Sequence, residues 1–204
     1  MATDSFTYSN GDLATVSSGA WVTVGGNGMT VGSNQITNGV NNQDSGAFWA
    51  TAFTTTHFSE ATISTTGTGT YQDLEVSTRG NTVGPDYYIA SVGNSGTGVE
   101  FYLRQGGTFT SMGAAVAYTG SHICHLESSG SNHTCLVDAV SVRTWTDATL
   151  NANTRIGIAG FTQAVGNVTL DNWQGGDLGA GGASDFSGTI LVLPRKVILQ
   201  SYEW

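Results

Sequence analysis

Apolar and polar residues alternate along much of this chain with a period of two. From Val99 to Arg104, apolar side chains (Val99, Phe101, Leu103) take turns with the others (Glu100, Tyr102, Arg104). Leu74 and Val76 alternate with Asp73 and Glu75 in the same way. Strands with one dry and one wet face indicate antiparallel sheets packed face to face, and argue against a buried parallel sheet.

Strand-length segments of this kind recur between short runs of Gly, Asn and Ser. They are Ala20–Val24, Gly46–Phe53, Phe58–Thr65, Tyr71–Thr78, Tyr87–Val92, Val99–Gln105, His122–Glu127, Thr134–Val140, Arg155–Phe161 and Asn167–Trp173. A spacing of about 8–12 residues per strand is typical of a sandwich or barrel. No window shows a sustained helical period, so we expect an all-β protein without a helix.

A hairpin is expected from His122 to Asp138, with its turn near Ser129–Gly130. Symmetry about that turn would place Cys124 directly opposite Cys135. In an oxidising compartment the two could form a disulfide, and with His122 and His133 they could form a zinc set. Free buried thiols are the third reading, and we expect no metal here.

The character of the chain changes after Leu178. Residues 179–188 are rich in Gly and predict a flexible linker, and residues 189–204 form an apolar arm divided by Pro194. An exposed apolar run is an aggregation hazard and has to be covered. The arm either folds back on its own domain or adds strands to a neighbour. Its candidate partner-binding residues are Ile190, Leu191, Val192, Leu193, Val197, Ile198, Leu199 and Trp204.

The composition of the chain argues against some classes of binding partner. The net charge is −9 with only six basic residues, which do not cluster, so nucleic acid and anionic membranes are not expected partners. No apolar run is long enough to span a bilayer. The first ten residues lack the features of a secretion signal, so none is expected. Charged residues make up 10% of the chain, against roughly 25% in an average domain, which leaves a neutral polar surface.

Two ends of the domain resemble a known family. Near the start, Asp4–Leu13 has the form D-x-F-x-x-x-x-G-x-L and precedes the Trp-containing segment Gly19–Trp21. Near the end, Ile156–Phe161 leads into Val168–Trp173, which contains Asp-Asn-Trp, and then into Gly176–Leu178. Together these segments resemble the opening and closing strands of concanavalin A-like, laminin-G-like jelly rolls of phage and bacterial proteins.

The resemblance implies a two-sheet jelly roll over residues 1–178 whose first and last strands meet. Members of that superfamily bind glycans or proteins, and some are glycosidases. Related domains occur on phage capsids and tails.

A glycosidase of this superfamily would carry three carboxylates on one strand. The nearest match is Asp73-Leu74-Glu75, whose two carboxylates lie roughly 6.6 Å apart on one face. Because the third carboxylate is missing, we expect a solvated strand face, no catalytic residue and no enzyme activity.

Sugar rings stack on exposed aromatic side chains. The candidates, if they face a concave sheet, are Trp49, Tyr87, Tyr88, Tyr102 and Trp145. Calcium is the one cofactor considered, with Asp44, Asp86, Asp147 and Asp171 near predicted turns, although no D-x-D-x-D spacing is present.

These observations favour a non-enzymatic virion accessory protein that decorates a capsid or tail. Its arm would bind capsid or tail subunits or other copies of the chain, and the protein would lie on the virion surface, outside the cell after release. The alternative is a carbohydrate-binding module or lectin-like adhesin, and a glycoside hydrolase is the third class.

Overall fold

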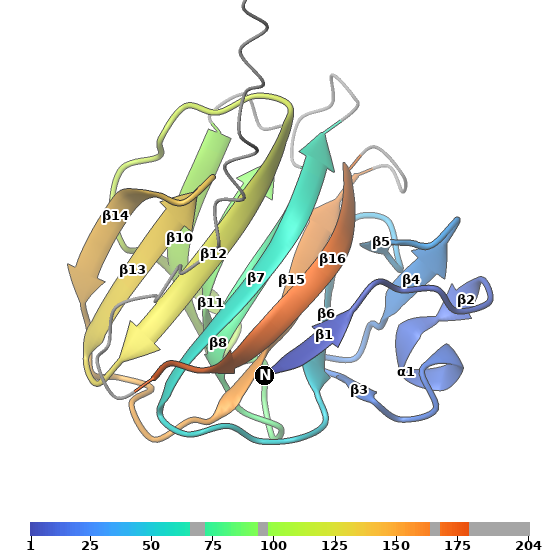
Figure 1. Cartoon of the computed structure of the whole chain (residues 1–204), viewed down its shortest axis with the longest axis horizontal. Helices are drawn as coiled ribbons and strands as arrows, with labels where there is room; N and C mark the ends of the chain where they lie inside the picture. Colours follow the sequence, from blue (N-terminus) through green and yellow to red (C-terminus); the bar gives the residue numbers. More distant parts are fainter. Residues whose placement is uncertain (66–71, 94–97, 164–167, 180–204) are drawn as a thin grey trace, which may run out of the picture.

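Alternating side chains fill the space between two antiparallel sheets, which lie one behind the other in Figure 1. The computed structural model describes residues 1–65, 72–93, 98–163 and 168–179. The expected linker beyond residue 179 and the arm of residues 189–204 lie outside the described residues.

The sheet nearer the viewer has nine strands in the order β14-β13-β12-β7-β16-β5-β4-β2, with β1 paired to β16. These strands are β1 (Ala2–Asp4), β2 (Gly11–Asp12), β4 (Met29–Gly32), β5 (Gln35–Asn38), β7 (Thr56–Thr65), β12 (Ser121–Ser129), β13 (Asn132–Val137), β14 (Val140–Thr146) and β16 (Val168–Asp177).

The second sheet has seven strands in the order β11-β10-β9-β8-β15-β6-β3. They are β3 (Trp21–Thr23), β6 (Asp44–Trp49), β8 (Gln72–Gly80), β9 (Tyr87–Gly93), β10 (Gly98–Gln105), β11 (Thr108–Ser111) and β15 (Arg155–Thr162). Each of the segments expected to be strands overlaps an observed strand, so the all-β sandwich is confirmed.

One short helix, α1 (Leu13–Val16), corrects the expectation of none. The Asp12 carboxylate caps it by accepting a hydrogen bond from the Thr15 N–H at 3.0 Å. A helix of four residues is too short to show an apolar period, which is why the pattern did not predict it. In the described residues no helix is long and apolar enough to cross a bilayer.

The two end motifs meet in space, as the resemblance implied. Strand β1 pairs with β16, and Asp4 lies opposite Trp173. The Asp4 carboxylate accepts hydrogen bonds from the backbone N–H of Phe6 and from the side chains of Tyr8 and Trp21, at 2.7 to 2.8 Å. Through these bonds Asp4 acts as a clamp, which holds the N-terminal segment of the chain against Trp21.

The closing motif also has a structural role. A β-bulge interrupts the pairing of β16 with β7 between Asp171 and Gln174, and Asn172 has a φ of +52°. The bulge lets Trp173 enter the core, where its ring lies 4.6 Å from that of Trp21. Trp173 Nε1 donates to the buried Ser59 hydroxyl at 2.9 Å. Asn tolerates the left-handed backbone of such a bulge better than most residues do.

The β12–β13 hairpin is confirmed, but its expected register is wrong. Cys124 pairs with Val137 and Leu126 pairs with Cys135, because the two-residue loop is Gly130–Ser131. Gly130 has a φ of +56°, which a tight turn requires at this position. The two cysteines still share the core face, but they are diagonal neighbours.

Candidate functional site

The seven-stranded sheet curves toward its outer side, and we call that side the concave face. The rings of Phe48 and Tyr87 lie 5.6 Å apart, although β15 and β8 separate their strands. Three strand steps span roughly 14 Å in a flat sheet. The Phe48 ring, which leans over Gly157 and Gly80, and a bend of the sheet toward both rings together bring them into contact.

Alternation determines which side chains line the concave face. In β8, Leu74 and Val76 belong to the main core, so Asp73, Glu75 and Ser77 point the other way. In β10, Glu100, Tyr102 and Arg104 alternate with core residues in the same manner. The predicted facing of both strands is confirmed.

The prediction that this face is solvated is wrong for Glu75 and Arg104, and the neighbouring Ser77 is buried as well. Glu75 is only 7% exposed, Arg104 8% and Ser77 0%. The curvature of the sheet makes neighbouring side chains cover one another, and alternation along one strand carries no information about curvature.

An apolar cluster occupies one end of the concave face. It consists of Val24, Phe48, Tyr87, Ile89 and Ala159, with Tyr102 packed against it. Phe48 lies over Gly157 and Gly80, where an added Cβ would come within 2.8 Å and 2.4 Å of its ring. The glycines therefore allow the ring to lie flat on the sheet.

Arg104 bridges the concave face. Its Nη2 donates to Asp44 Oδ2 at 2.8 Å and its Nη1 donates to the Tyr87 hydroxyl at 2.9 Å. The guanidinium also lies over the rings of Tyr87 and Phe109, at 5.5 and 5.3 Å from their centroids. The positive charge of Arg104 is thus already compensated within the protein.

Carboxylates gather on the rest of this face. Burial raises the pKa of Asp73 to about 6, helped by the charge of Glu100. Burial also raises the pKa of Glu75 well above its usual value, and Asp73 and Asp44 add to this while Arg104 opposes it. Burial among like charges therefore favours the protonated form of Glu75.

Two aromatic rings border the carboxylates. The rings of Tyr102 and Phe109 lie edge to face at 6.1 Å, and Phe109 is 42% exposed. The Tyr102 hydroxyl donates to Glu100 Oε2 at 3.0 Å. Burial, followed by this bond, raises the pKa of Tyr102 to about 12, so the hydroxyl stays protonated.

Of the aromatic residues expected to hold a glycan, Tyr87 and Tyr102 lie on the concave face. The structure corrects the expectation for the others, because Tyr88, Trp49 and Trp145 pack against the main core. Tyr88 is fully buried and its hydroxyl donates to Asp147, while Trp49 stacks on Trp173 at 5.3 Å.

Sequence reasoning missed Phe109, Glu100, Arg104 and Asp44 as members of this site. Phe109 could have been found, because the Gly106–Gly107 turn folds β11 onto β10 and pairs Phe109 with Arg104. Asp44 could not have been found from the sequence, because it belongs to β6 and three other strands lie between β6 and the strand of Arg104.

The other predicted sites do not assemble in the described residues. Cys124 and Cys135 are buried free thiols, and the hydrogen bond with Cys135, followed by burial, raises the pKa of Cys124. No group of three or more His, Cys, Asp or Glu side chains in the described part of the chain could hold a metal ion.

The four aspartates considered for calcium each have a different partner within the protein. Asp44 binds Arg104, Asp86 accepts from Gly106, Asp147 from Tyr88 and Thr149, and Asp171 from Asn172.

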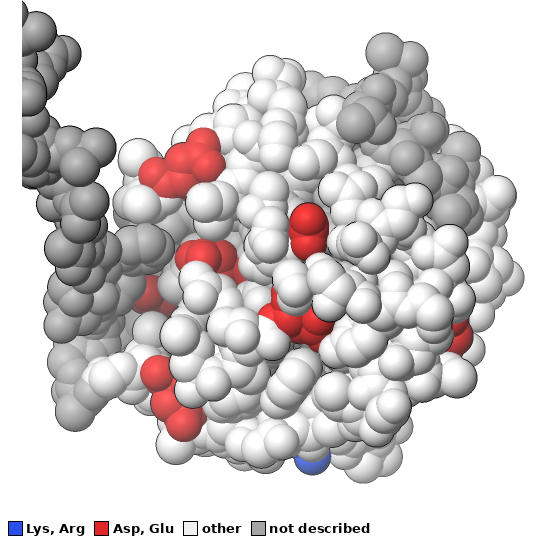
Figure 2. Space-filling model, turned by 45° about the vertical axis from the view of Figure 1, so that its right-hand side comes forward, with Lys and Arg blue, Asp and Glu red and all other residues white. Residues whose placement is uncertain are grey.

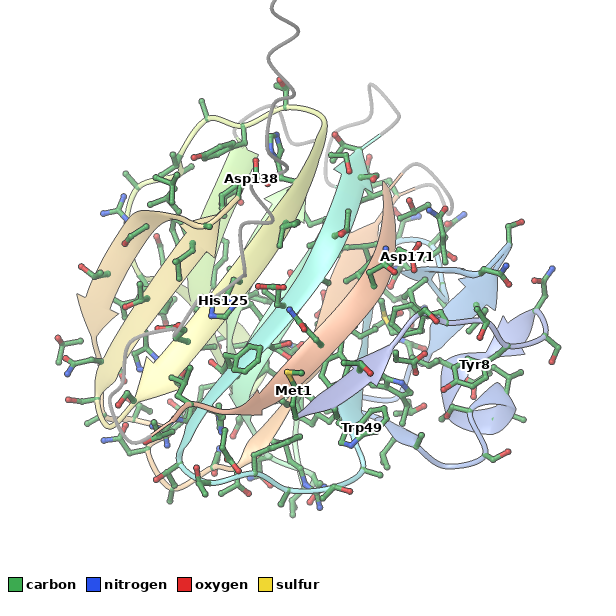
Figure 3. The ribbon with its side chains drawn as sticks, viewed as in Figure 1. Met1, Tyr8, Trp49, His125, Asp138 and Asp171 are labelled. Atoms are coloured by element: carbon green, nitrogen blue, oxygen red, sulfur yellow. The ribbon has the colours of Figure 1, made fainter. Side chains whose placement is uncertain are left out.

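A second charged cluster lies on the outer face of the nine-stranded sheet, around His125 (Figure 3). The His125 ring bonds Glu60 at 2.8 Å and Glu127 at 3.0 Å, and Phe58 stacks on it at 5.0 Å. Burial opposes protonation of His125, but the bonds to the two carboxylates raise its pKa. Since both ring nitrogens of His125 bond to carboxylates of the protein, the cluster links β7 to β12 and has a structural role.

The surface itself is largely uncharged. Figure 2 shows acidic side chains scattered over a face on which uncharged residues predominate. This agrees with the composition of the chain.

No protein-family model and no curated protein matches this chain at the sequence level. Solved structures do match. The carbohydrate-binding module CBM66 from Bacillus subtilis superimposes with a TM-score of 0.65 at 14% identity, over 78% of this chain and 96% of that one. The exoplasmic/lumenal domain of VIP36, in its Ca²⁺/Man-bound form, gives 0.57 at 11% identity, over 78% of this chain and 83% of that one.

A GH43 protein from Bacillus licheniformis gives a TM-score of 0.65 at 9% identity, over 86% of this chain but only 39% of that one. At such identities these likenesses establish the fold alone. The chain has the fold of a two-sheet antiparallel jelly roll, as the end motifs implied.

Proposed function

We propose that this chain is a non-catalytic carbohydrate-binding module and that it holds its glycan on the concave face. The observation that carries the proposal is the half-exposed ring pair of Tyr102 and Phe109 beside Glu100 and Asp73. Sugar rings present apolar C–H faces to aromatic rings and hydroxyls to carboxylates, and this face offers both.

The matched structures support the proposal. The description of CBM66 names carbohydrate binding, and the VIP36 domain was solved with mannose. In each case the superposition covers more than four fifths of the other chain, so most of that domain shares this fold. A virion placement, with the arm of residues 189–204 as its anchor, stays a prediction of the sequence.

The proposal is tested by a glycan array on the whole chain, followed by titration calorimetry on the best ligand. Tyr102→Ala and Phe109→Ala should each weaken binding about tenfold, because stacking on a ring contributes on the order of 1.4 kcal/mol. Tyr118→Ala is the matched control, because Tyr118 contacts His122 outside the concave face. An array without saturable hits, or equal losses in all three variants, would refute the proposal.

A glycoside hydrolase is the second candidate, and the raised pKa values of Asp73 and Glu75 favour it. A carboxylic acid that keeps its proton near neutral pH can act as a general acid. We expect no release of reducing ends from array-positive oligosaccharides after long incubation. Release that disappears in Glu75→Gln would establish the enzyme instead.

A further inference from the structure

Apolar and charged side chains share one patch on the outer face of the nine-stranded sheet, the side turned away from the core. We call it the outer patch. Directly paired residues of antiparallel strands point to the same face, so the register places its members side by side. They are Phe58 and Glu60 on β7, His125 and Glu127 on β12, and Leu136 on β13. The outer patch therefore spans three adjacent strands, with His125 between its neighbours (Figure 3).

Four members of the outer patch are nearly inaccessible to solvent. His125 is 4% exposed, Glu60 and Glu127 are 7% exposed, and Leu136 is 9% exposed. Leu136 belongs to neither hydrophobic cluster, and in Figure 1 no described helix or strand lies over this face. Side chains that stand next to one another on a sheet shield their flanks but leave their tips open. Such low exposure therefore calls for a layer of chain over the patch.

The charges of the outer patch do not balance. Glu60 and Glu127 both bond His125, which can carry one positive charge. The described arginines lie elsewhere and donate to Asp44 or to backbone carbonyl groups; they are Arg79, Arg104, Arg143 and Arg155. The two remaining basic residues of the chain are Arg195 and Lys196. A segment that carries them would supply the missing positive charge.

The described chain ends beside the outer patch. The Leu178 N–H donates to Thr56 O at 2.9 Å, so the chain leaves the sheet at the start of β7, the strand that carries Glu60. The steps along β7 to Glu60 and across to His125 place the patch roughly 14 Å from Thr56. A Gly-rich chain as long as residues 179–188 has a root-mean-square span of roughly 17 Å. A linker that matches the distance in this way gives the arm a high local concentration at the patch.

We propose that the arm of residues 189–204 folds back on its own domain and covers the outer patch, where it brings a basic side chain to Glu60 and Glu127. Burial of apolar residues supplies the driving force, and the carboxylates fix the position of the arm. This gives the folding-back alternative of the sequence a defined location. It does not depend on the glycan-binding function, because the concave face belongs to the other sheet.

The sequence of the arm fits the outer patch in two ways. Aliphatic residues stand on both sides of its basic pair, and the patch offers Phe58 and Leu136 to them. Consecutive side chains of an extended segment point to opposite sides, so one of Arg195 and Lys196 faces the sheet while the other faces solvent. One of these two positions, and not both, should therefore contact the carboxylates.

Zero-length cross-linking tests this location, because a carbodiimide joins an amine to a carboxylate only when the two are in contact. Lys196 is the only lysine of the chain, so the lysine end of every product is unambiguous. Two proteins are compared at low concentration. They are the natural chain and Arg195→Lys/Lys196→Gln, which moves the lysine by one position. Peptide mass spectrometry identifies the products and separates them from those of the N-terminal amine.

We expect a cross-link from the lysine to Glu60 or Glu127 in one of the two proteins, and much less of it in the other. It should disappear when Glu60→Gln and Glu127→Gln are combined. The matched control is Asp171→Asn, which removes a carboxylate of the same sheet outside the patch and should leave the cross-link unchanged. A cross-link to Asp73 on the concave face instead, or none in either protein, overturns the inference.

Isotope labelling shows which chain supplies the arm. Labelled (¹⁵N) and unlabelled protein are mixed in urea, refolded together and cross-linked. Folding back within one chain joins only peptides that carry the same label. Cross-links between labelled and unlabelled peptides in the statistical proportion would mean that the arm reaches a second copy, and would overturn the proposal.

Urea denaturation tests the charge pairing by a second route. Replacing both Arg195 and Lys196 by Gln should raise the unfolding equilibrium constant about threefold in the natural chain. The same replacement should have almost no effect when Glu60→Gln and Glu127→Gln are already present, because the partners of the basic side chain are gone. An equal factor in both backgrounds would show that the arm and the carboxylates do not interact, and overturns the inference.

Discussion

Arg104 Nη2 lies 2.8 Å from Asp44 Oδ2, although β9, β8 and β15 separate the strands that carry the two residues. Four strand steps would span roughly 19 Å in a flat sheet. The reach of the Arg104 side chain and the curvature of the seven-stranded sheet together close this span. The ion pair also holds the guanidinium above Tyr87, next to the carboxylates of β8.

Removing one member of this pair should destabilise the fold. Asp44→Asn leaves the Arg104 side chain, which is 10% exposed, without its carboxylate partner. Because the Asp44 side chain is 34% exposed and partly screened, we expect a loss of about 1–2 kcal/mol, less than for a fully buried pair. Urea denaturation at pH 7 measures it. The more exposed pair of Asp138 and His122 is the control, and Asp138→Asn should have the smaller effect. Equal effects would show that the bridge is as weak as a surface pair.

Asp73→Asn should stabilise the protein above pH 6 and have little effect near pH 4. The folded-state pKa of Asp73 is about 6 and the ordinary value is 3.8. Between these values the folded protein holds a proton that the unfolded chain has lost, so stability falls as the pH rises through this window. The gain on substitution should reach about 3 kcal/mol above pH 6. Urea denaturation of both proteins at pH 4, 5, 6 and 7.5 checks this. A constant difference at every pH would contradict the assignment.

Asp4→Ala should be much more damaging than Asp12→Ala. Asp4 accepts three hydrogen bonds, from Phe6, Tyr8 and Trp21. Its removal leaves the indole of the buried Trp21 without an acceptor, and we expect a loss of about 3 kcal/mol. Asp12 caps an exposed helix of four residues, so its loss should be about 1 kcal/mol. Thermal melts of the two variants give the comparison. Similar melting temperatures would mean that the opening motif does not stabilise the fold as a clamp.

A strand could be predicted from the sequence when one of its faces packs in the core and the other does not. Val99–Arg104 and Asp73–Val76 alternate because one side of each strand packs in the core, so both strands were expected. Strand β11 is exposed at every position and β14 at most positions, so neither shows a period of two. Strands β4 and β5 are four residues each, too short for an alternation to stand out.

The site was harder to predict than the fold for a related reason. Alternation assigned Glu75, Tyr102 and Arg104 to the correct side of the sheet, and the end motifs predicted that β1 would meet β16. Curvature is a property of the whole sheet, however, and in the folded protein Glu75 and Arg104 are buried rather than solvated. For that reason sequence reasoning treated Asp73 and Glu75 as surface, and it could not pair Arg104 with Asp44.

Acid should destabilise the protein through two buried histidines. His57 and His133 are at most 1% exposed, and burial lowers the pKa of each to about 4. Each is held in one neutral tautomer. Nε2 of His57 accepts from the Arg79 N–H at 3.0 Å, so Nδ1 donates to Thr54 O at 2.7 Å. Nε2 of His133 donates to Asp147 O at 3.1 Å, so its Nδ1 accepts from Ser128.

A depressed histidine pKa means that the unfolded chain binds protons first. Stability is complete above pH 6.5 and is lost as the pH falls toward 4, by about 2–3 kcal/mol per histidine. His57→Gln removes one of these two histidines. The difference in unfolding free energy, natural protein minus His57→Gln, should therefore fall by about 2–3 kcal/mol between pH 7.5 and pH 4. The control His122→Gln should show the opposite trend, because hydrogen bonding to Asp138 raises the pKa of His122. Urea denaturation of the natural protein and both variants between pH 7.5 and pH 4 measures these differences. A difference between natural protein and His57→Gln that stays constant with pH would mean that His57 titrates normally and is not sealed in the core.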